Sequence, residues 1–233
     1  MIKKREFGDG PIYSFFNYVM WIFTSNIYFM LCNSLLIIYL LVFSGDIKST
    51  YFLLYLVLLP LAPALTALYA TVGKIIREKD ISVTSYFFKS YKTNFKQAFI
   101  LGFMECTAIL VSIKDIQYFS TVKYGAYFTP FFIVLILFVF CIGLYAFPLL
   151  SRFYLKTVDI LKFSFVYSVR KINITIFNLT SIIVAAFILY QFPSISVFFI
   201  FSGTCYLIMY YETTILNELE SKTVKSENQK GGQ

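Results

Sequence analysis

Six apolar segments, each close to the length of a membrane-crossing helix, take up most of this sequence. They span Phe15–Phe43, Tyr51–Val72, Gln97–Ser112, Thr129–Leu150, Ile172–Phe192 and Ile195–Tyr211. A helix needs about 20 apolar residues to cross the roughly 30 Å hydrocarbon core of a bilayer. Charged residues make up only 14% of the chain, whereas soluble domains carry about 25%. The sequence therefore predicts an all-α, polytopic membrane helical bundle of about six transmembrane helices.

Lysine and arginine are divided unequally between the connections of these segments. Seventeen of the 20 lie in the N-terminus, in the connections after the second and fourth segments and in the C-terminal tail. Because positively charged connections stay in the cytoplasm, both termini are predicted to be cytoplasmic in a multi-pass protein of the plasma membrane. The same distribution accounts for the net charge of +8. We therefore expect the lipid bilayer as a partner of these charges, and no nucleic acid.

The chain is predicted to form one transmembrane domain over residues 1–217, followed by a disordered cytoplasmic tail over 218–233, which is polar. Within the domain, Leu68-Tyr69-Ala70 recurs as Leu144-Tyr145-Ala146. Each copy ends an outside-to-inside segment and precedes a basic, aromatic connection. This echo suggests an internal repeat of a helix–loop–helix unit, of the kind known in transporters.

One acidic residue, Glu105, lies near the middle of the third apolar segment. A carboxyl group at that depth is costly, and it usually faces a bundle interior or a wet cavity. Two interpretations stay open. Glu105 contacts a proton, a cation or a substrate, or it forms a structural hydrogen bond to another helix.

Polar and helix-breaking residues also interrupt the first two segments. Asn26 and Asn33 are seven residues apart and share one helix face. Hydrogen bonds between helices are the expected role of such residues, with substrate binding as the alternative. Pro60 and Pro63 remove backbone donors from the second segment, so we expect a kink there.

The basic connection after the second segment has a helical pattern. Phe88, Tyr91 and Phe95 follow each other at spacings of a single helix face, and Lys96 belongs to a neighbouring basic face. One interpretation is a helix that lies at the lipid headgroups. The other is a docking loop for a partner protein, formed by these four residues.

The chain lacks the residues of common catalytic and metal sites. It contains no histidine, which is the commonest metal ligand and general base. Each of the four cysteines lies in an apolar run without a CxxC pair, so we expect free thiols. We find no metalloprotease, phosphate-loop or hydrolase motif. The sequence therefore predicts no enzyme, no metal site and no cofactor.

Three stretches carry a family resemblance. They are Gly-Pro-Ile-Tyr-Ser-Phe-Phe-Asn at 10–17, the block 59–97 with its Pro-bearing helix end, Ala-Leu-Tyr, basic turn and Asn-Phe-Lys-Gln, and Tyr-Ala-Phe-Pro-Leu-Leu-Ser-Arg-Phe at 145–153. Together they resemble the YesL-like family of bacterial membrane proteins, a domain of unknown function. The chain departs from the family pattern by an extra stretch between Asn26 and Pro60, with an extracytoplasmic turn around 44–50.

The resemblance implies a bacterial plasma-membrane protein, typically encoded beside ABC importers and carbohydrate enzymes. It therefore implies an accessory or interaction subunit that docks on a carbohydrate ABC importer permease. The alternative is an autonomous small-solute transporter or channel that uses Glu105. The family supplies no established catalytic or binding residues to place on this chain.

Overall fold

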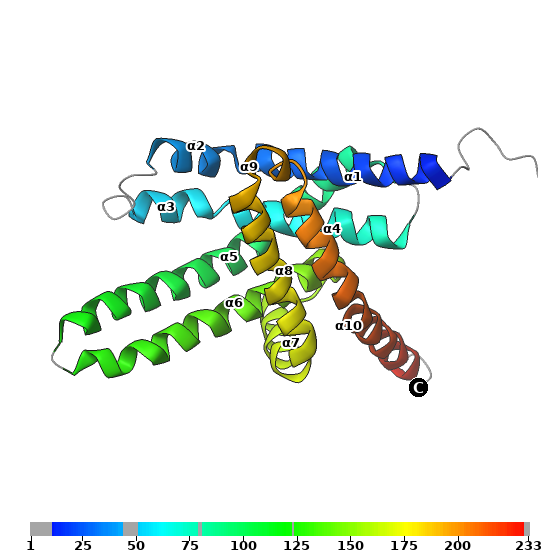
Figure 1. Cartoon of the computed structure of the whole chain (residues 1–233). Helices are drawn as coiled ribbons and strands as arrows, with labels where there is room; N and C mark the ends of the chain where they lie inside the picture. Colours follow the sequence, from blue (N-terminus) through cyan, green and yellow to red (C-terminus); the bar gives the residue numbers. More distant parts are fainter. Residues whose placement is uncertain (1–10, 44–50, 79–80, 123, 231–233) are drawn as a thin grey trace, which may run out of the picture.

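The structure is a computed structural model that describes residues 11–43, 51–78, 81–122 and 124–230. Helices account for nearly all of these residues, and no strand occurs among them (Figure 1). The predicted turn at 44–50 and the basic residues Lys3, Lys4 and Arg5 lie outside the described residues. The elements are α1 (Pro11–Cys32), α2 (Ser34–Val42), α3 (Tyr51–Leu58), α4 (Leu61–Arg77), α5 (Val83–Thr121), the 3₁₀ helix η1 (Gly125–Phe128), α6 (Thr129–Arg152), α7 (Thr157–Arg170), α8 (Ile172–Gln191), α9 (Pro193–Ser196) and α10 (Ile200–Lys230).

Four stretches of helix within the described ranges are long and apolar enough to cross a membrane. They are Ile12–Cys32, Phe52–Arg77, Thr129–Arg152 and Ile172–Gln191. They coincide with the first, second, fourth and fifth predicted segments, and they support a helical membrane protein. The third and sixth predicted segments lie within α5 and α10, which are longer helices with more charged residues.

Two of the predicted segments are broken in the middle. Asn33 separates α1 from α2, because its side-chain Nδ2 donates to the carbonyl of Phe29 at 2.8 Å and a local side-chain bond competes with the helix. Pro60 separates α3 from α4, which confirms the predicted kink. Pro63 lies in the first turn of α4, where a missing N–H group costs no helical hydrogen bond.

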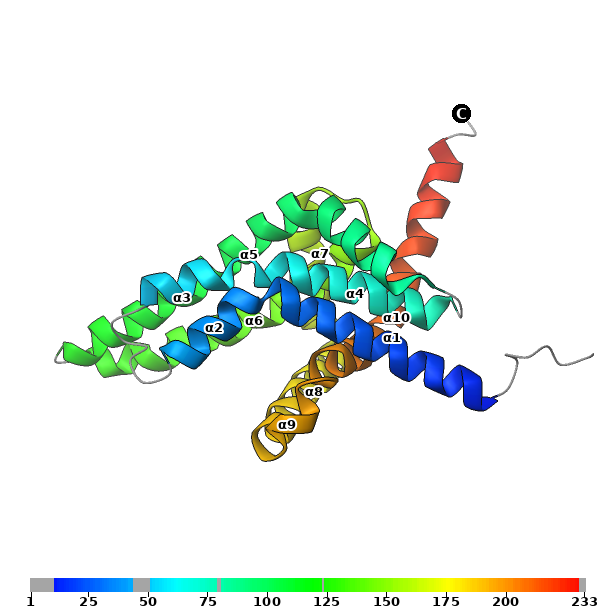
Figure 2. The ribbon, with the colours of Figure 1, turned by 90° about the horizontal axis from the view of Figure 1, so that it is seen from above.

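Helix α4 forms the centre of the fold. Its side chains Ala64, Ala67 and Thr71 are fully buried, and α1, α5, α6 and α10 all pack against it (Figure 2). Small residues allow this close approach. One such approach is between Gly102 of α5 and Ala62 of α4, where a Cβ atom on residue 102 would overlap that of Ala62.

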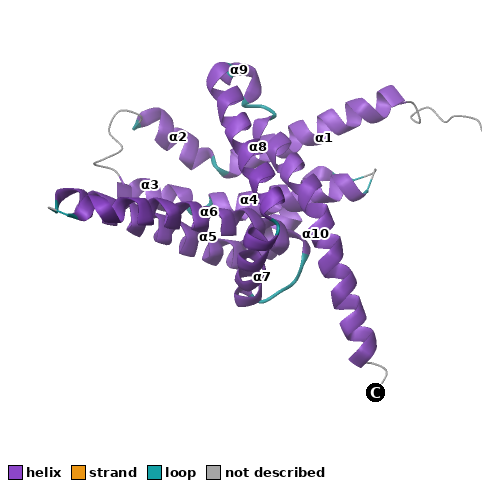
Figure 3. Ribbon diagram, turned by 60° about the horizontal axis from the view of Figure 1, so that its bottom comes forward, coloured by secondary structure: helices purple, strands orange, loops and turns teal. Residues whose placement is uncertain are grey.

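Helices α8, α9 and α10 form the predicted hairpin at Pro193. Helix α8 packs mainly against α10. In Figure 3 the α9 end of this hairpin, the C-terminal part of α10, α1, and the α5–α6 pair extend in different directions from the region of α4. Many of their outward-facing side chains are large, apolar and exposed, as expected for helices that contact lipid.

The segment that we predicted as a cytoplasmic docking loop is helical. Phe88, Tyr91, Phe95 and Lys96 lie in the first half of α5, which continues without a break to Thr121. The helical spacing of these residues was therefore predicted, but their continuity with the membrane segment was not. The reason is that no glycine or proline separates the two parts, so the helix has no local signal to end.

Most of the predicted tail lies within the described extent of α10. Helix α10 runs from Ile200 through the predicted boundary at 217 and 218 to Lys230. Leu216 and Leu219 still pack against the core, and many of the residues that follow are good helix formers. Residues 231–233 lie outside the description.

The two units of the predicted internal repeat pack differently. In the first unit the basic segment and the membrane segment form one helix, α5, that packs along α4. In the second unit the corresponding basic segment is the separate helix α7, and α8 packs mainly against α10. The packing of the two units therefore does not support the hypothesis of an internal repeat.

Candidate functional site

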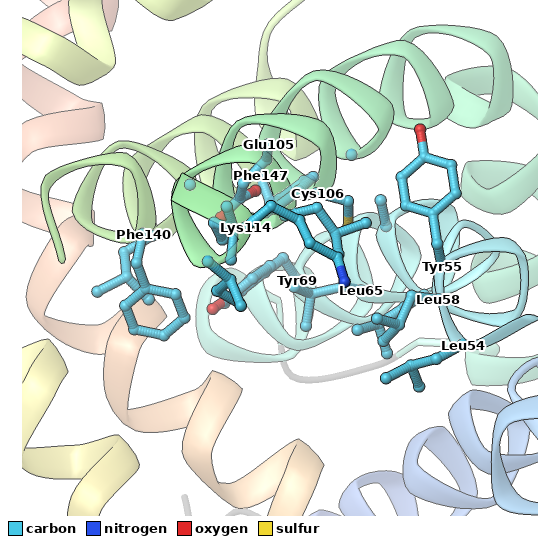
Figure 4. Close-up of a pocket in the computed structure, with 18 residues that line it drawn as sticks. Leu54, Tyr55, Leu58, Leu65, Tyr69, Glu105, Cys106, Lys114, Phe140 and Phe147 are labelled. Carbon is cyan, nitrogen blue, oxygen red and sulfur yellow. The ribbon is translucent and has the colours of Figure 1, made fainter. Parts of the chain in front are cut away.

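A cavity of about 350 Å³ lies between α3, α4, α5 and α6 (Figure 4). Helix α5 contributes Gly102, Glu105, Cys106, Ile109 and Ile113, which recur at three- and four-residue spacings and so share one helix face. The other walls are mostly leucine and phenylalanine. They are formed by Leu54, Leu58, Leu61, Leu65, Phe140, Leu144 and Phe147, with the polar residues Tyr55 and Tyr69 among them. Lys114 of α5 also lines the cavity.

The carboxyl group of Glu105 lies against the backbone of α6. A Cβ atom on Gly143 would overlap the Oε1, Cδ and Oε2 atoms of Glu105. Only glycine at position 143 therefore leaves room for the carboxyl group in this place. Both residues come from helices that the sequence predicted to cross the membrane, but their contact joins positions 38 residues apart.

Among the described residues, the carboxyl group of Glu105 has no hydrogen-bond or ion-pair partner in the cavity. Tyr55 shares a hydrogen bond with Thr107 at 2.9 Å, and Lys114 donates to Gln117 at 3.4 Å. Within the described part of the chain, no hydrogen bond or ion pair reaches the Glu105 carboxyl group. The predicted structural hydrogen bond to another helix is thus not formed by any described residue.

Two smaller cavities adjoin the first. One, of about 170 Å³, is also lined by Glu105, Gly143 and Phe147. The other, of about 300 Å³, shares Leu65, Tyr69, Phe140 and Leu144 with the first cavity. The Glu105 carboxyl group therefore stands at the wall between two cavities.

Asn26 has a structural role, which was the expected one. It is fully buried. Its Nδ2 donates to the carbonyl of Val197 at 2.8 Å, and its Oδ1 accepts from the backbone N–H of Ser202 at 3.1 Å. Ser202 lies in the first turn of α10, where backbone donors lack a partner inside the helix. Asn26 thus fixes α1 to the start of α10.

The side chain of Asn33 donates to the carbonyl of Phe29 in the last turn of α1. Its Oδ1 atom is buried and has no hydrogen-bond partner among the described residues. Asn33 does not line the Glu105 cavity. The structure therefore places the three predicted binding residues, Glu105, Asn26 and Asn33, at three separate sites.

The predicted docking residues are only partly available. Phe88 and Phe95 are 39% and 41% exposed, while Tyr91 is half-buried against the core. Burial raises the pKa of the Tyr91 hydroxyl above its ordinary value. Phe88 also lies against Tyr28 of α1, with ring centroids 5.1 Å apart. Lys96 is exposed beside Phe95.

A buried polar pair between α8 and α10 was not predicted. Nδ2 of Asn178 donates to Oε1 of Glu212 at 2.7 Å, and the two residues are 0% and 1% exposed. Glu212 directly follows the last residue of the sixth predicted segment, and it was not among the predicted site residues. The signal that could have found the pair is the hairpin itself. Asn178 and Glu212 lie at similar distances from the turn at Pro193.

Charged and polar side chains connect the C-terminal part of α10 to the rest of the chain. Arg152 donates to Asn217 Oδ1 at 2.7 Å and forms an ion pair with Glu220. Lys171 forms a second ion pair with Glu218 at 3.6 Å. The four cysteines are free thiols. In the described residues no group of three or more His, Cys, Asp or Glu side chains is placed to hold a metal ion.

A comparison with known protein families finds a match to one segment of the chain. Residues 13–116, which run from α1 into α5 and include Glu105, match the family described as protein of unknown function, DUF624. No curated protein and no solved structure matches the chain. The match confirms the resemblance to the YesL-like family, which this description denotes. Residues 13–116 are therefore similar to DUF624, a family whose function is unknown.

Proposed function

We propose that this protein crosses the bacterial plasma membrane six times, with both termini in the cytoplasm, and acts as an accessory subunit of carbohydrate ABC import. In this arrangement it catalyses no reaction and binds a permease. The carbohydrate link comes from the family resemblance. The observation that carries the docking role is the exposure of Phe88 and Phe95 beside basic residues on α5.

The packing of the helix ends supports six crossings. Gln97 of α5 donates to the carbonyl of Leu155, just after α6, at 2.7 Å, so the middle of α5 lies level with the end of α6. Arg152 at the end of α6 pairs with Glu220 of α10. The basic ends of these helices therefore gather on one side, which is the expected cytoplasmic side.

Reporter fusions test whether α5 and α10 cross the membrane. Alkaline phosphatase, which is active only outside the cytoplasm, is expected to be inactive when fused after residue 80 and active when fused after residue 123. Fusions after residue 194 and residue 233 are expected to be active and inactive, respectively. Equal activity at 80 and 123 would remove α5 from the crossings, and equal activity at 194 and 233 would remove α10.

The exposed aromatic residues of α5 have the composition of a binding surface. Phe88 and Phe95 lie two turns apart, and Lys89, Lys92 and Lys96 are exposed between and beside them. Aromatic residues in the centre of an interface contribute much of its binding energy, and basic residues at the rim favour an acidic partner. A permease with an apolar groove and an acidic rim would match this surface.

A pull-down from a host that carries the importer tests the docking role. We expect the tagged protein to recover a permease, and Phe88→Ala or Phe95→Ala to reduce the recovered amount about tenfold or more, as loss of a central interface residue does. Phe131→Ala is the matched control, because Phe131 is 63% exposed on α6, away from this surface. Unchanged recovery with both α5 variants would contradict the docking surface.

The alternative function is transport of a small solute past Glu105. One observation favours it, namely that the Glu105 carboxyl group borders two cavities and contacts no polar partner among the described residues. Under this alternative the tagged protein is recovered without a permease in the same pull-down. The observed walls are mainly apolar, so we place the accessory function first.

A further inference from the structure

The Glu105 cavity has the size of a small-molecule site. Its volume of about 350 Å³ falls at the low end of the roughly 300–1,000 Å³ that ligand pockets occupy. Its α5 wall extends from Gly102 to Ile113, which corresponds to about 16 Å along the helix axis. The cavity therefore follows α5 and is large enough for a small, mainly apolar molecule.

The chemistry of the cavity is that of an apolar wall with one unpaired acid. An isolated carboxylate away from water is costly, and a cation placed beside it offsets that cost. Lys114 lies nine residues, or about 13 Å of helix, from Glu105, and it donates to Gln117. No other described residue that lines the cavity is basic. No described basic residue of the cavity pairs with Glu105, so a cationic ligand is a partner that would offset its negative charge.

The position of the carboxyl group leaves space for that ligand. Gly143 allows the Glu105 carboxyl to lie flat against α6, and free volume adjoins it in both the 350 Å³ and the 170 Å³ cavity. Next to Glu105, Phe103 and Met104 are 46% and 48% exposed on the outer face of α5. An apolar molecule dissolved in the membrane would therefore contact the outer face of α5, opposite the face that lines the cavity.

We propose that this cavity binds a small amphiphile with an apolar body and a protonated amine, whose ammonium group pairs with Glu105. A hydroxyl head group could donate one hydrogen bond but would leave the negative charge uncompensated. An acidic head group would add a second negative charge. The site is separate from the Phe88 and Phe95 surface, so this inference goes beyond the accessory function.

Three probes of equal size test the proposal. They are 1-adamantylamine, 1-adamantanol and 1-adamantanecarboxylate at neutral pH. Binding to the protein in lipid nanodiscs is measured by calorimetry, with empty nanodiscs subtracted. We expect the amine to bind about tenfold or more tightly than the alcohol, as a charge-assisted bond implies, and the carboxylate to bind most weakly.

Two variants assign the preference to the carboxyl group. Glu105→Gln keeps the size of the side chain and is expected to make the amine bind no better than the alcohol. Gly143→Ala keeps the charge but displaces the carboxyl group, and it is expected to weaken amine binding severalfold; it also serves if Glu105→Gln does not fold. Glu78→Gln, which alters an exposed glutamate on the far end of α4, is expected to bind like the unmodified protein.

Results with the unmodified protein and with the variants could each contradict the proposed amine site. Equal binding of amine and alcohol by the unmodified protein would overturn the proposal, as would no binding of any probe. Unchanged amine preference in Glu105→Gln, or in Gly143→Ala where the first variant does not fold, would also overturn it.

Discussion

Replacing Asn178 with leucine is expected to lower the free energy of unfolding by about 1–3 kcal/mol, the cost of leaving a buried polar group without a partner. In the native protein the side-chain amide of Asn178 donates to Glu212 at 2.7 Å, and both residues are buried between α8 and α10. Leucine fills a similar volume but cannot donate. The Glu212 carboxyl group would then be buried without its partner.

The double variant Asn178→Leu with Glu212→Leu separates loss of the hydrogen bond from poor packing. Removing both polar groups is expected to restore most of the lost stability, because a buried polar pair replaced by apolar residues of similar shape is often neutral. Stability is measured by unfolding in a series of detergent mixtures, followed by circular dichroism. If the double variant is as unstable as the sum of the two single variants, the pair is not the source of the effect.

Replacing Gly102 with alanine is expected to destabilise the protein by about 1–3 kcal/mol, as overpacking of a tight contact does. The added methyl group would overlap the Cβ atom of Ala62 on α4. Ala62 is itself buried, at 6% exposure, and its Cβ atom has no rotamer to which it can move. Helices α4 and α5 must therefore separate to admit the new group.

Gly203→Ala provides a matched control on α10. A Cβ atom at position 203 meets no other atom within 4 Å, so this substitution is expected to be neutral or to raise stability by up to about 1 kcal/mol, because alanine is the better helix former. The double variant Gly102→Ala with Ala62→Gly exchanges the methyl group between the helices and is expected to recover stability. Equal effects of Gly102→Ala and Gly203→Ala would contradict the close α4–α5 contact.

The local features of the fold were predictable from the sequence. In a membrane every backbone polar group must be satisfied inside its own segment, so apolar length alone identifies the helices. The break at Pro60 follows from a missing backbone donor. The free cysteines also followed from their apolar surroundings. The break at Asn33 was missed, because asparagine in a membrane helix more often bonds to another helix.

The candidate site was predictable only in part. Glu105 was singled out because a carboxyl group is rare in an apolar segment. Its lack of a partner, its contact with Gly143 and its place between two cavities depend on α6 and on α3 and α4, which approach it only in the folded chain. The sequence predicted that Asn26 forms hydrogen bonds to another helix. It could not predict the partners Val197 and Ser202, because they lie more than 170 residues away.

By itself, the sequence determined that the chain is helical and which of its segments are apolar enough to cross a membrane. These properties depend on each residue and its near neighbours along a helix. Only the tertiary structure decided which polar groups are paired. Asn178 donates to Glu212, Asn26 caps α10, and Glu105 is left facing a cavity. The physical reason is that a hydrogen bond requires atoms within about 3 Å, and helix packing alone brings such distant residues that close.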